Sequence, residues 1–325
     1  MAKSSNQKLK LMYLKDILEN ESDEKHPLSV NYLKQRLLDY GITAERKAIY
    51  SDIEELRLYG LDIICERGRS NEYYVGERYF ELAELKMLVD AVQASKFLTE
   101  KKSEQLIRKL CSLCSKHEAT QLNRNVINYR RIKNRNEAIY YAVDEIHNAI
   151  NNDKTISFKY YQYVGNKHRE FKKDGEKYYV SPVTLVWDDE NYYLIGYDND
   201  AGHIKHFRVD KITDISTEST PRTGEDATGK IDLAEYSKKV FSMFAGEEKE
   251  VRLEFDSSFC GVIIDRFGSD IMIVPEKDKF CVNVKVEISP QFFGWLCSLS
   301  GNVRISAPKE VKDMYIEHLN TVMQG

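Results

Sequence analysis

Apolar residues near the start of the chain recur first at the spacing of helices and then at the spacing of strands. The three- and four-residue spacing that buries one helical face runs through residues 7–20, 30–40 and 43–59. Two short apolar runs, residues 61–65 and 72–75, then flank a polar turn that contains a glycine. The first quarter of the chain therefore predicts three helices followed by a β-hairpin.

The ends of these helices carry residues that commonly cap helices. Ser29 precedes the second helix and can accept a hydrogen bond from its first turn, whereas Gly41 and Gly60 follow the second and third helices. Thr43 is expected to cap the third helix. The loop between the second and third helices is therefore short, as it is in a helix-turn-helix.

The third helix has two contrasting faces. Ile49, Ile53 and Leu56 share one face, which we expect to pack against the first two helices. The other side of its N-terminal half is polar and cationic, and this half of a recognition helix enters the major groove in a winged helix-turn-helix. Together with the turn of the hairpin, it predicts duplex DNA contacts from Thr43, Arg46, Lys47, Tyr50, Ser51, Arg67 and Arg69.

An ordinary three-helix domain with surface cations is the alternative explanation of this pattern. Glu45, Glu54 and Glu55 lie on the same helix, and their charge opposes that of a phosphate backbone. Glu54 and Glu55 belong to the C-terminal half of the helix, away from the expected contact. DNA binding is therefore the preferred interpretation.

The remaining pattern divides into helical, strand-rich and mixed parts. Residues 78–150 are mostly helical, and the β-rich runs that begin at residue 154 predict a small barrel. Those runs are residues 154–163, 177–187, 191–198 and 203–216, separated by predicted turns at 164–176, 188–190 and 199–202. A turn-rich linker and a short helix at 231–244 follow, and residues 249–321 alternate between strand and helix.

These parts predict a multidomain α+β protein. The expected domains are a winged helix-turn-helix at residues 1–77, a helical connector at 78–150, an SH3- or Sm-like β-barrel at 151–220, a linker helix at 221–248 and a small α+β domain at 249–325. No apolar run approaches the ~18 residues that span a bilayer. The polar N-terminus lacks the apolar core of a signal peptide, so a cytoplasmic location is expected.

The overall charge does not favour nucleic acid, because 52 acidic residues outnumber 48 Lys and Arg residues, which gives a net charge of −4. The cations are unevenly distributed, however. Residues 100–135 hold ten Lys and Arg residues and His117 against three Glu. This cationic block is either a solvated helix face or a surface that faces phosphate, and the sequence leaves both interpretations open.

The six scattered cysteines predict free, buried thiols in a reducing compartment. Cys111, Cys114 and His117 resemble half of a zinc site, but a structural zinc needs four ligands, so no metal is expected. A redox role for the two cysteines stays open. The sequence has no glycine-rich phosphate loop, G-x-S-x-G or H-E-x-x-H motif, so neither catalysis nor a cofactor is expected.

The β-rich part carries the most specific motif in the chain. Residues 178–212, YYVSPVTLVWDDENYYLIGYDNDAGHIKHFRVDKI, resemble the WYL domain, which is named for a Trp-Tyr-Leu triplet. The triplet stands here as Tyr192-Tyr193-Leu194, with Ser181-Pro182 before it and a Phe-Arg-Val-Asp-Lys-Ile run at 207–212 after it. The segment ERKAIYSDIEELRLYG looks like the winged helix that accompanies this domain, and FGWLCSLSGNVRISAP is similar to its C-terminal extension, called WCX.

This resemblance implies a homodimeric bacterial transcriptional regulator whose barrel senses an anionic ligand, namely a nucleotide or a single-stranded nucleic acid. The ligand residues of the family map onto Tyr179, Ser181, Tyr193, Lys205, His206 and Arg208. Because alternate residues of a strand share a face, His206 should lie beside Arg208 and Tyr179 beside Ser181. The alternative is that the tyrosines belong to the barrel core and that Arg208 pairs with Asp210 or Asp214.

Two other functions remain as alternatives. The first is a nucleic-acid-processing enzyme that uses the barrel tyrosines and His206, although no acidic cluster for a catalytic metal lies near them in the sequence. The second is an adaptor whose winged helix docks a partner protein. The expected partners of a regulator are a double-stranded DNA operator, the effector and a second copy of the chain, with no membrane.

Overall fold

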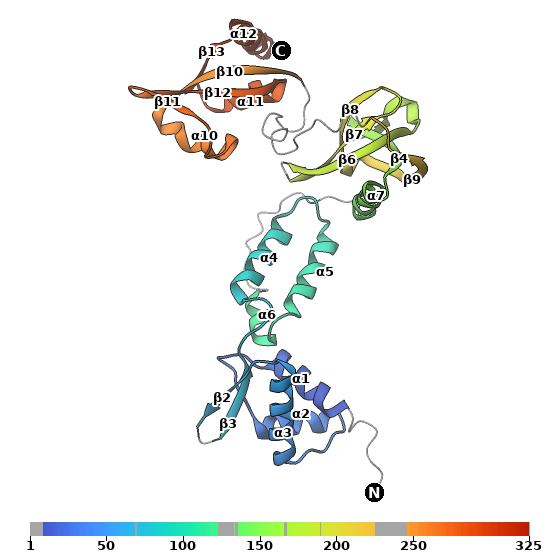
Figure 1. Ribbon diagram of the computed structural model, residues 1–325, viewed down its shortest axis with the longest axis vertical. Helices are drawn as coiled ribbons and strands as arrows, with labels where there is room; N and C mark the ends of the chain where they lie inside the picture. The colour runs from blue at the N-terminus through green and yellow to red at the C-terminus, as the bar shows by residue number, and fades with distance from the viewer. Residues whose placement is uncertain are drawn as a thin grey trace. The chain divides into compact units, whose positions relative to one another are not determined.

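The computed structural model describes residues 9–68, 70–122, 133, 136–165, 168–188, 190–224 and 246–324. Those residues form a mixed α+β structure with three sheets (Figure 1). The chain divides into two compact units, residues 1–137 and 138–325. No helix in the described ranges is long and apolar enough to cross a membrane. The predicted helix at 231–244 and much of the cationic block lie outside those ranges.

Three helices and a small sheet begin the first unit, as the spacing of apolar residues predicts. The helices are α1 (Lys10–Glu21), α2 (Val30–Asp39) and α3 (Arg46–Tyr59), and the strands are β1 (Leu28–Ser29), β2 (Ile63–Arg67) and β3 (Asn71–Val75). The strands are ordered β1-β3-β2, and both pairs are antiparallel. Leu14, Leu33, Ile49 and Ile53 are buried together in the core of this part.

One predicted helix cap is confirmed and another is wrong. The Ser29 hydroxyl accepts a hydrogen bond from the Tyr32 backbone N–H at 3.3 Å. Thr43 does not cap α3, because the helix begins at Arg46 and its N-cap is Glu45, without a side-chain hydrogen bond. Ile42 and Ala44 are buried, and burying both holds the chain extended past Thr43 before the helix can start.

The predicted helical connector contains α4 (Leu82–Ala94), α5 (Glu100–Cys111) and α6 (Lys116–Leu122), and Figure 1 shows α4 and α5 side by side. Leu85, Cys114 and Leu122 form its small buried core. A capping box between Glu81 and Glu84 satisfies the first turn of α4.

A buried carboxylate joins this connector to the first two helices. The Glu21 carboxylate, at the end of α1, accepts hydrogen bonds from Arg36 at 2.6 and 2.9 Å, from the Tyr32 hydroxyl at 2.6 Å and from the Lys116 ammonium group at 2.9 Å. Burial by itself raises the pKa of the Glu21 carboxyl, but the hydrogen bonds from these three partners outweigh burial and lower it to about 2. Lys116, a member of the cationic block, is therefore committed to an internal ion pair.

We expect Glu21 to make the unit that contains it sensitive to acid. Its folded pKa of about 2 lies below its ordinary value of 4.5, so its stabilisation is complete above pH 4.5 and is lost as the pH falls toward 2. Glu21→Gln should lower the free energy of unfolding at pH 7 by about 2 kcal/mol, the scale of a hydrogen bond to a charged group. Far-UV circular dichroism during urea unfolding, at pH values from 7 to 3, should show a shallower loss of stability in the variant. Parallel curves for the two proteins would contradict this assignment.

A six-stranded, strongly curved sheet and one helix begin the second unit. The strands are β4 (Lys154–Val164), β5 (His168–Phe171), β6 (Tyr178–Asp188), β7 (Asn191–Asp198), β8 (His203–Arg208) and β9 (Ile212–Pro221). They are ordered β5-β4-β6-β7-β8, and β9 pairs with β4 (Figure 1). Helix α7 (Ile139–Asn151) packs against β4, β6 and β9, so it belongs with this sheet rather than with the connector to which its helical pattern assigned it.

The predicted turn at residues 164–176 is only partly correct. Strand β4 continues to Val164, and β5 returns beside it, with Tyr163 opposite Arg169 and Tyr161 opposite Phe171. The four side chains of β5 are all exposed, so the alternation of buried and exposed positions that identifies a strand is missing there. The predicted turn at 199–202 separates β7 from β8, whereas of the predicted turn at 188–190, Asp188 is the last residue of β6 and residue 189 lies outside the described residues.

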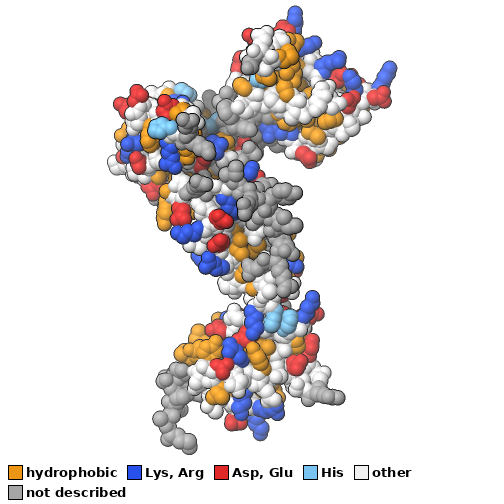
Figure 2. Space-filling model, turned by 180° about the vertical axis from the view of Figure 1, so that it is seen from behind, with side chains coloured by type: hydrophobic (Ala, Val, Ile, Leu, Met, Phe, Trp, Pro, Cys, Tyr) orange, Lys and Arg blue, Asp and Glu red, His pale blue; other side chains and the backbone are white. Residues whose placement is uncertain are grey.

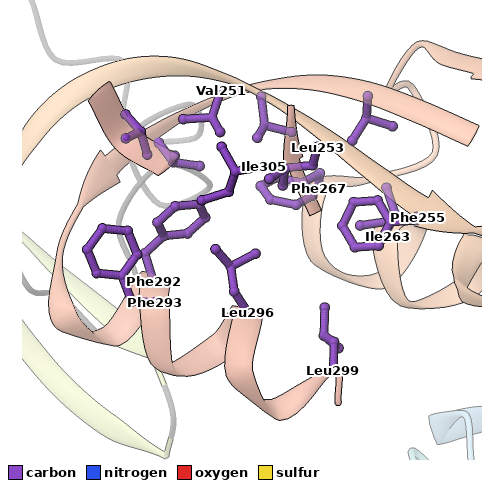
Figure 3. Close-up of a cluster of buried hydrophobic side chains, with 14 of the residues drawn as sticks. Val251, Leu253, Phe255, Ile263, Phe267, Phe292, Phe293, Leu296, Leu299 and Ile305 are labelled. Atoms are coloured by element: carbon purple, nitrogen blue, oxygen red, sulfur yellow. The ribbon is translucent and has the colours of Figure 1, made fainter. Parts of the chain in front are cut away.

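The C-terminal part alternates strand and helix, as predicted. Its elements are β10 (Glu247–Asp256), α10 (Cys260–Phe267), β11 (Ile273–Glu276), β12 (Lys279–Ile288), α11 (Pro290–Ser298), β13 (Val303–Ala307) and α12 (Lys309–Gln324). The antiparallel sheet is ordered β11-β12-β10-β13. Figure 3 shows Phe292, Phe293 and Leu296 of α11 pointing into a core shared with Leu253 and Phe255 of β10.

Candidate nucleic-acid interfaces

The outer face of α3 is polar and exposed along its N-terminal half. Arg46, Lys47, Tyr50 and Ser51 are exposed there, and Thr43 is exposed in the turn before the helix. Ile49, Ile53 and Leu56 are buried on the opposite face, as predicted. The first turn contains no acidic residue, so the partial positive charge of the helix N-terminus adds to the two cations.

Few internal contacts hold these side chains. The Arg46 guanidinium donates one hydrogen bond to the Asn31 side-chain oxygen at 2.8 Å, a neutral partner that leaves its charge uncompensated. The Tyr50 ring lies 6.5 Å from that of Tyr73 and remains 37% exposed. Lys and Arg side chains gather at the lower end of the first unit in Figure 2, around the start of α3.

Acidic residues on α3 are partly neutralised within the fold. Asp52 pairs with Lys10 at 2.8 Å, and Glu54 pairs with Arg57 at 2.6 Å. Glu45 and Glu55 are exposed. The predicted contact surface therefore has two cations at its centre and one acid, Glu45, at its edge.

The hairpin contributes one described cation to the predicted DNA contacts. Arg67, the last residue of β2, is exposed beside the turn. Arg69 lies outside the described residues.

A cavity of about 620 Å³ lies elsewhere in the first unit, between the hairpin and the start of α4. Its acidic lining residues are Asp23, Glu24, Asp62, Glu77, Glu81, Glu84 and Glu118. Arg78, its cationic lining residue, lies 3.7 Å from Glu118. An acidic lining of this kind repels phosphate, so the cavity is not a nucleic-acid site.

Most of the predicted ligand residues in the second unit lie on one face of the curved sheet. Residues directly opposite one another in an antiparallel pair share a face. Tyr193 lies opposite Arg208, and Ile195 lies opposite His206. Tyr193 and Ile195 are two positions apart on β7, so all four side chains share a face. Ser181 lies opposite Tyr197, and Tyr179 precedes it by two residues on β6. The predicted sharing of a face by His206 and Arg208, and by Tyr179 and Ser181, is therefore confirmed.

Lys205 lies on the other face of the sheet, contrary to its assignment to this site. Residues 205 and 206 alternate along β8, and the Lys205 ammonium group pairs with the buried Asp198 carboxylate at 2.7 Å. Burial would raise the pKa of Asp198, but the hydrogen bond from Lys205 and backbone N–H groups outweigh burial and lower it. Lys205 therefore compensates a buried charge within the fold.

Ser181 also has a structural role. Its hydroxyl donates to the Asn199 side-chain oxygen at 2.9 Å and accepts from the Thr223 backbone N–H at 2.9 Å. The residue is buried. These bonds hold the segment after β9 against the sheet, so an incoming ligand finds no open hydrogen-bonding position on this side chain.

Arg208 is held by Asp210, in the turn between β8 and β9, and by Asn191 of β7, and the pairing with Asp210 is the one that the alternative interpretation gave. Its guanidinium donates two hydrogen bonds of 3.0 Å to the Asp210 carboxylate and one of 2.9 Å to the Asn191 side chain. Tyr193 is buried, whereas Tyr179 is exposed and His206 is half-buried. The predicted ligand face therefore has Tyr179 and His206 at its surface and a neutralised arginine beside them.

We expect Arg208 and Asp210 to depend on one another for stability. Arg208→Ala leaves the Asp210 carboxylate, whose side chain is 11% exposed, with Lys211 at 3.4 Å as its remaining cation. The single substitution should cost about 1–3 kcal/mol of unfolding free energy. In a double-mutant cycle with Asp210→Ala, measured by urea unfolding, the coupling should exceed about 1 kcal/mol. Additive effects would show that the ion pair contributes no stability of its own.

Cys111 and Cys114 are thiols in the surroundings that the structure gives them. Burial raises the pKa of both, that of Cys114 to about 11, so both stay protonated at neutral pH. The Cys114 thiol donates to the Cys111 carbonyl oxygen at 3.5 Å. Elsewhere in the described ranges, Glu254, Glu276 and Cys281 lie close together, but Lys279 pairs with Glu254 and Arg252 with Glu276.

A family model for the WYL domain matches residues 141–217, which comprise most of α7 and the sheet through the first half of β9. No curated protein matches the sequence.

Two solved structures are similar to this chain at low sequence identity. Proteasome accessory factor B/C (PafBC) of Arthrobacter aurescens is 16% identical with a TM-score of 0.29, over 96% of this chain and 48% of that one. This chain thus spans about half of PafBC. A CRISPR Cas-related protein is 10% identical with a TM-score of 0.35, over 94% of this chain and 98% of that one. Similarity this distant carries no argument about function.

Proposed function

Because residues 141–217 form a WYL domain, we propose that this chain is a DNA-binding transcriptional regulator whose WYL domain senses an anionic ligand. The observation that carries the proposal is the division of α3. Its apolar residues are buried against α1 and α2, while Arg46, Lys47, Tyr50 and Ser51 face outward from its N-terminal half. A groove-reading helix needs this arrangement.

The acidity of the whole molecule does not argue against this function. In physiological salt, exposed charges are screened beyond about 8–10 Å, so a bound duplex responds to the charges near it. The nearby charges are those of Arg46 and Lys47 and, at the edge, of Glu45, while Asp52 and Glu54 are already paired inside the unit. Local cations on a contact surface are therefore sufficient, although the net charge is −4.

In this proposal each part of the chain has a separate task. Residues 1–77 act as a winged helix-turn-helix, residues 78–137 connect it to the WYL domain, and the sheet from residue 249 onward serves as a WCX-like domain. The protein acts in the cytoplasm as a homodimer, which presents two copies of α3. Two such helices about 34 Å apart read a palindromic operator with half-sites one helical turn apart.

The effector is a nucleotide or a single-stranded nucleic acid, bound on the WYL sheet. Tyr179 is exposed there and can stack a base. Such a ligand changes operator affinity only if it binds one arrangement of the dimer more tightly than another.

A gel-shift titration of the full-length protein with the duplex upstream of its own gene tests the proposal. Binding that weakens steeply with salt is the expected result, because released counterions drive phosphate contacts. If no shift appears even at low salt, the helix face instead docks a partner protein. If the protein hydrolyses nucleotides in the presence of a divalent metal, the chain is an enzyme and the proposal fails.

A further inference from the structure

We propose that the two-stranded ribbon of β4 and β5, with Lys211 beside it, is a binding site for single-stranded nucleic acid. The site, called here the ribbon site, consists of Lys159, Tyr161, Tyr163, Arg169, Phe171 and Lys211. It rests on the proposed function, because it narrows the effector of the sensing domain to single strands and adds to the Tyr179 face a second surface that binds them. None of the residues predicted from the sequence to bind the ligand belongs to it.

The strand register brings the ribbon residues onto one face. Tyr163 lies opposite Arg169 and Tyr161 opposite Phe171, and Lys159 precedes Tyr161 by two positions. The Tyr161 ring lies 5.5 Å from that of Tyr163 and 6.2 Å from that of Phe171, edge-to-face in both cases. Three aromatic rings therefore form a continuous row along the ribbon.

Cations lie between and beside these rings. The Arg169 guanidinium is centred 4.6 Å from the Tyr161 ring and 5.9 Å from the Tyr163 ring. The Lys211 ammonium group lies 4.3 Å from the Tyr163 ring, and the Lys159 ammonium group lies 6.0 Å from the Phe171 ring. Rings that alternate with cations are what a sequence-tolerant single-strand site requires, since bases stack on rings and phosphates meet cations.

The row is anchored at one ring and open at the others. Tyr161 is buried, and its hydroxyl donates to the Asp210 carbonyl oxygen at 3.0 Å. Tyr163 is 51% exposed and Phe171 is 41% exposed. A base can therefore reach two rings whose positions are fixed by the third, which lowers the entropic cost of binding.

Arg169 differs from the other cations of this sheet in its partners. Arg208 and Lys211 lie beside Asp210, Lys205 beside Asp198 and Lys159 beside Asp214, but Arg169 has no carboxylate partner in the part of the chain that the structure describes. Its hydrogen bond to the Tyr163 phenol lowers the pKa of that phenol. The neighbouring Glu170 is engaged by Gln162 at 2.7 Å. The planar guanidinium therefore keeps its full charge and can bind two oxygens of one phosphate.

Single strands fit this surface better than duplexes do. Bases in a duplex are stacked on one another and cannot lie against Tyr163 or Phe171, whereas unpaired bases expose both faces. A purely acidic peptide also fits this surface poorly, because it could pair with the cations but would leave the exposed rings uncovered.

The test measures fluorescence anisotropy of fluorescein-labelled DNA and RNA of mixed sequence, each about 12 nucleotides long, with the full-length protein. This length falls within the roughly 4–16 nucleotides that single-strand sites cover. Arg169→Gln should weaken binding about fivefold or more and reduce the salt slope by about 0.7, the value for one lost phosphate contact. Tyr163→Leu should weaken binding roughly five- to a hundredfold, whereas Tyr163→Phe should keep most of the affinity.

Arg304→Gln, which removes an exposed strand arginine from β13, is the matched control and should bind like the wild type. The inference is overturned if the wild type binds no single strand, or if Arg169→Gln and Arg304→Gln bind alike. If the wild-type protein shifts its operator duplex in a gel but binds no single strand, the ribbon site is wrong and the proposed function still stands. If single strands bind in a way that depends on Arg169 but the operator duplex does not shift, the ribbon site is supported and the proposed function fails.

Discussion

The double substitution Arg46→Ala, Lys47→Ala is expected to weaken operator binding roughly a hundredfold or more without lowering the free energy of unfolding. Arg46 can donate two hydrogen bonds to guanine, a contact worth about 1–3 kcal/mol, and Lys47 can neutralise a phosphate. Both side chains are exposed, and among the described residues the partner of Arg46 is the neutral side chain of Asn31, so the fold loses little. Anisotropy titrations at several salt concentrations measure both the affinity and its salt slope.

The matched control is Lys309→Ala, Lys312→Ala, which removes two exposed cations from α12. This variant has the same net charge as the first, so a general charge effect would weaken operator binding equally in both. If the two variants bind alike, α3 does not read the operator. If the α3 variant instead unfolds more easily, its cations are structural and the alternative of an ordinary three-helix domain is correct.

Phe292→Ala is expected to lower the free energy of unfolding of the C-terminal part by about 3–5 kcal/mol. Phe292 is fully buried, and its ring lies 5.7 Å from Phe293 and 6.4 Å from Trp295 within the core of Figure 3. Removing it leaves a cavity that the surrounding β10 and β12 strands cannot close without losing their register. Urea unfolding followed by Trp295 fluorescence reports on this core directly.

Trp187, the other tryptophan of the chain, lies on β6, so the experiment is best done in a Trp187→Phe background. Met323→Ala, at an exposed position of α12, is the control and should change the stability by less than about 0.5 kcal/mol. Equal losses from Phe292→Ala and Met323→Ala would mean that this core does not stabilise the C-terminal part.

The N-terminal helices and the C-terminal alternation could be predicted because their apolar residues keep a regular spacing. Ile49, Ile53 and Leu56 mark the buried face of α3, and Gly60, with its φ of +108°, ends that helix where a left-handed residue is needed. Thr43 misled the prediction, because the burial of Ile42 and Ala44 is a tertiary effect that overrides a local capping preference.

The ligand residues were harder to predict than the fold. Residue type alone could not show that the Ser181 hydroxyl is hydrogen-bonded to Asn199 and Thr223, or that the Lys205 ammonium group pairs with the buried Asp198 carboxylate. Arg169 of the proposed ribbon site was not singled out from the sequence, because β5 has four exposed side chains and therefore lacks the spacing that marks a strand. The strand register, which decides which side chains meet, depends on pairing between residues distant in sequence.

The cluster around Glu21 has a mechanical consequence. It fastens α6 to α1 and α2 through Lys116, Arg36 and Tyr32, and two further contacts strengthen the joint: the Ser115 hydroxyl donates to Asp23 at 2.5 Å, and the rings of His26 and His117 stack at 3.8 Å. A displacement of α6 therefore moves α1 and α2 with it, because these contacts hold the three helices together as one rigid group. In the regulator proposed above, α1, α2 and α6 therefore act as one body, and Glu21→Gln is expected to loosen that body without removing any residue of the predicted DNA contact surface.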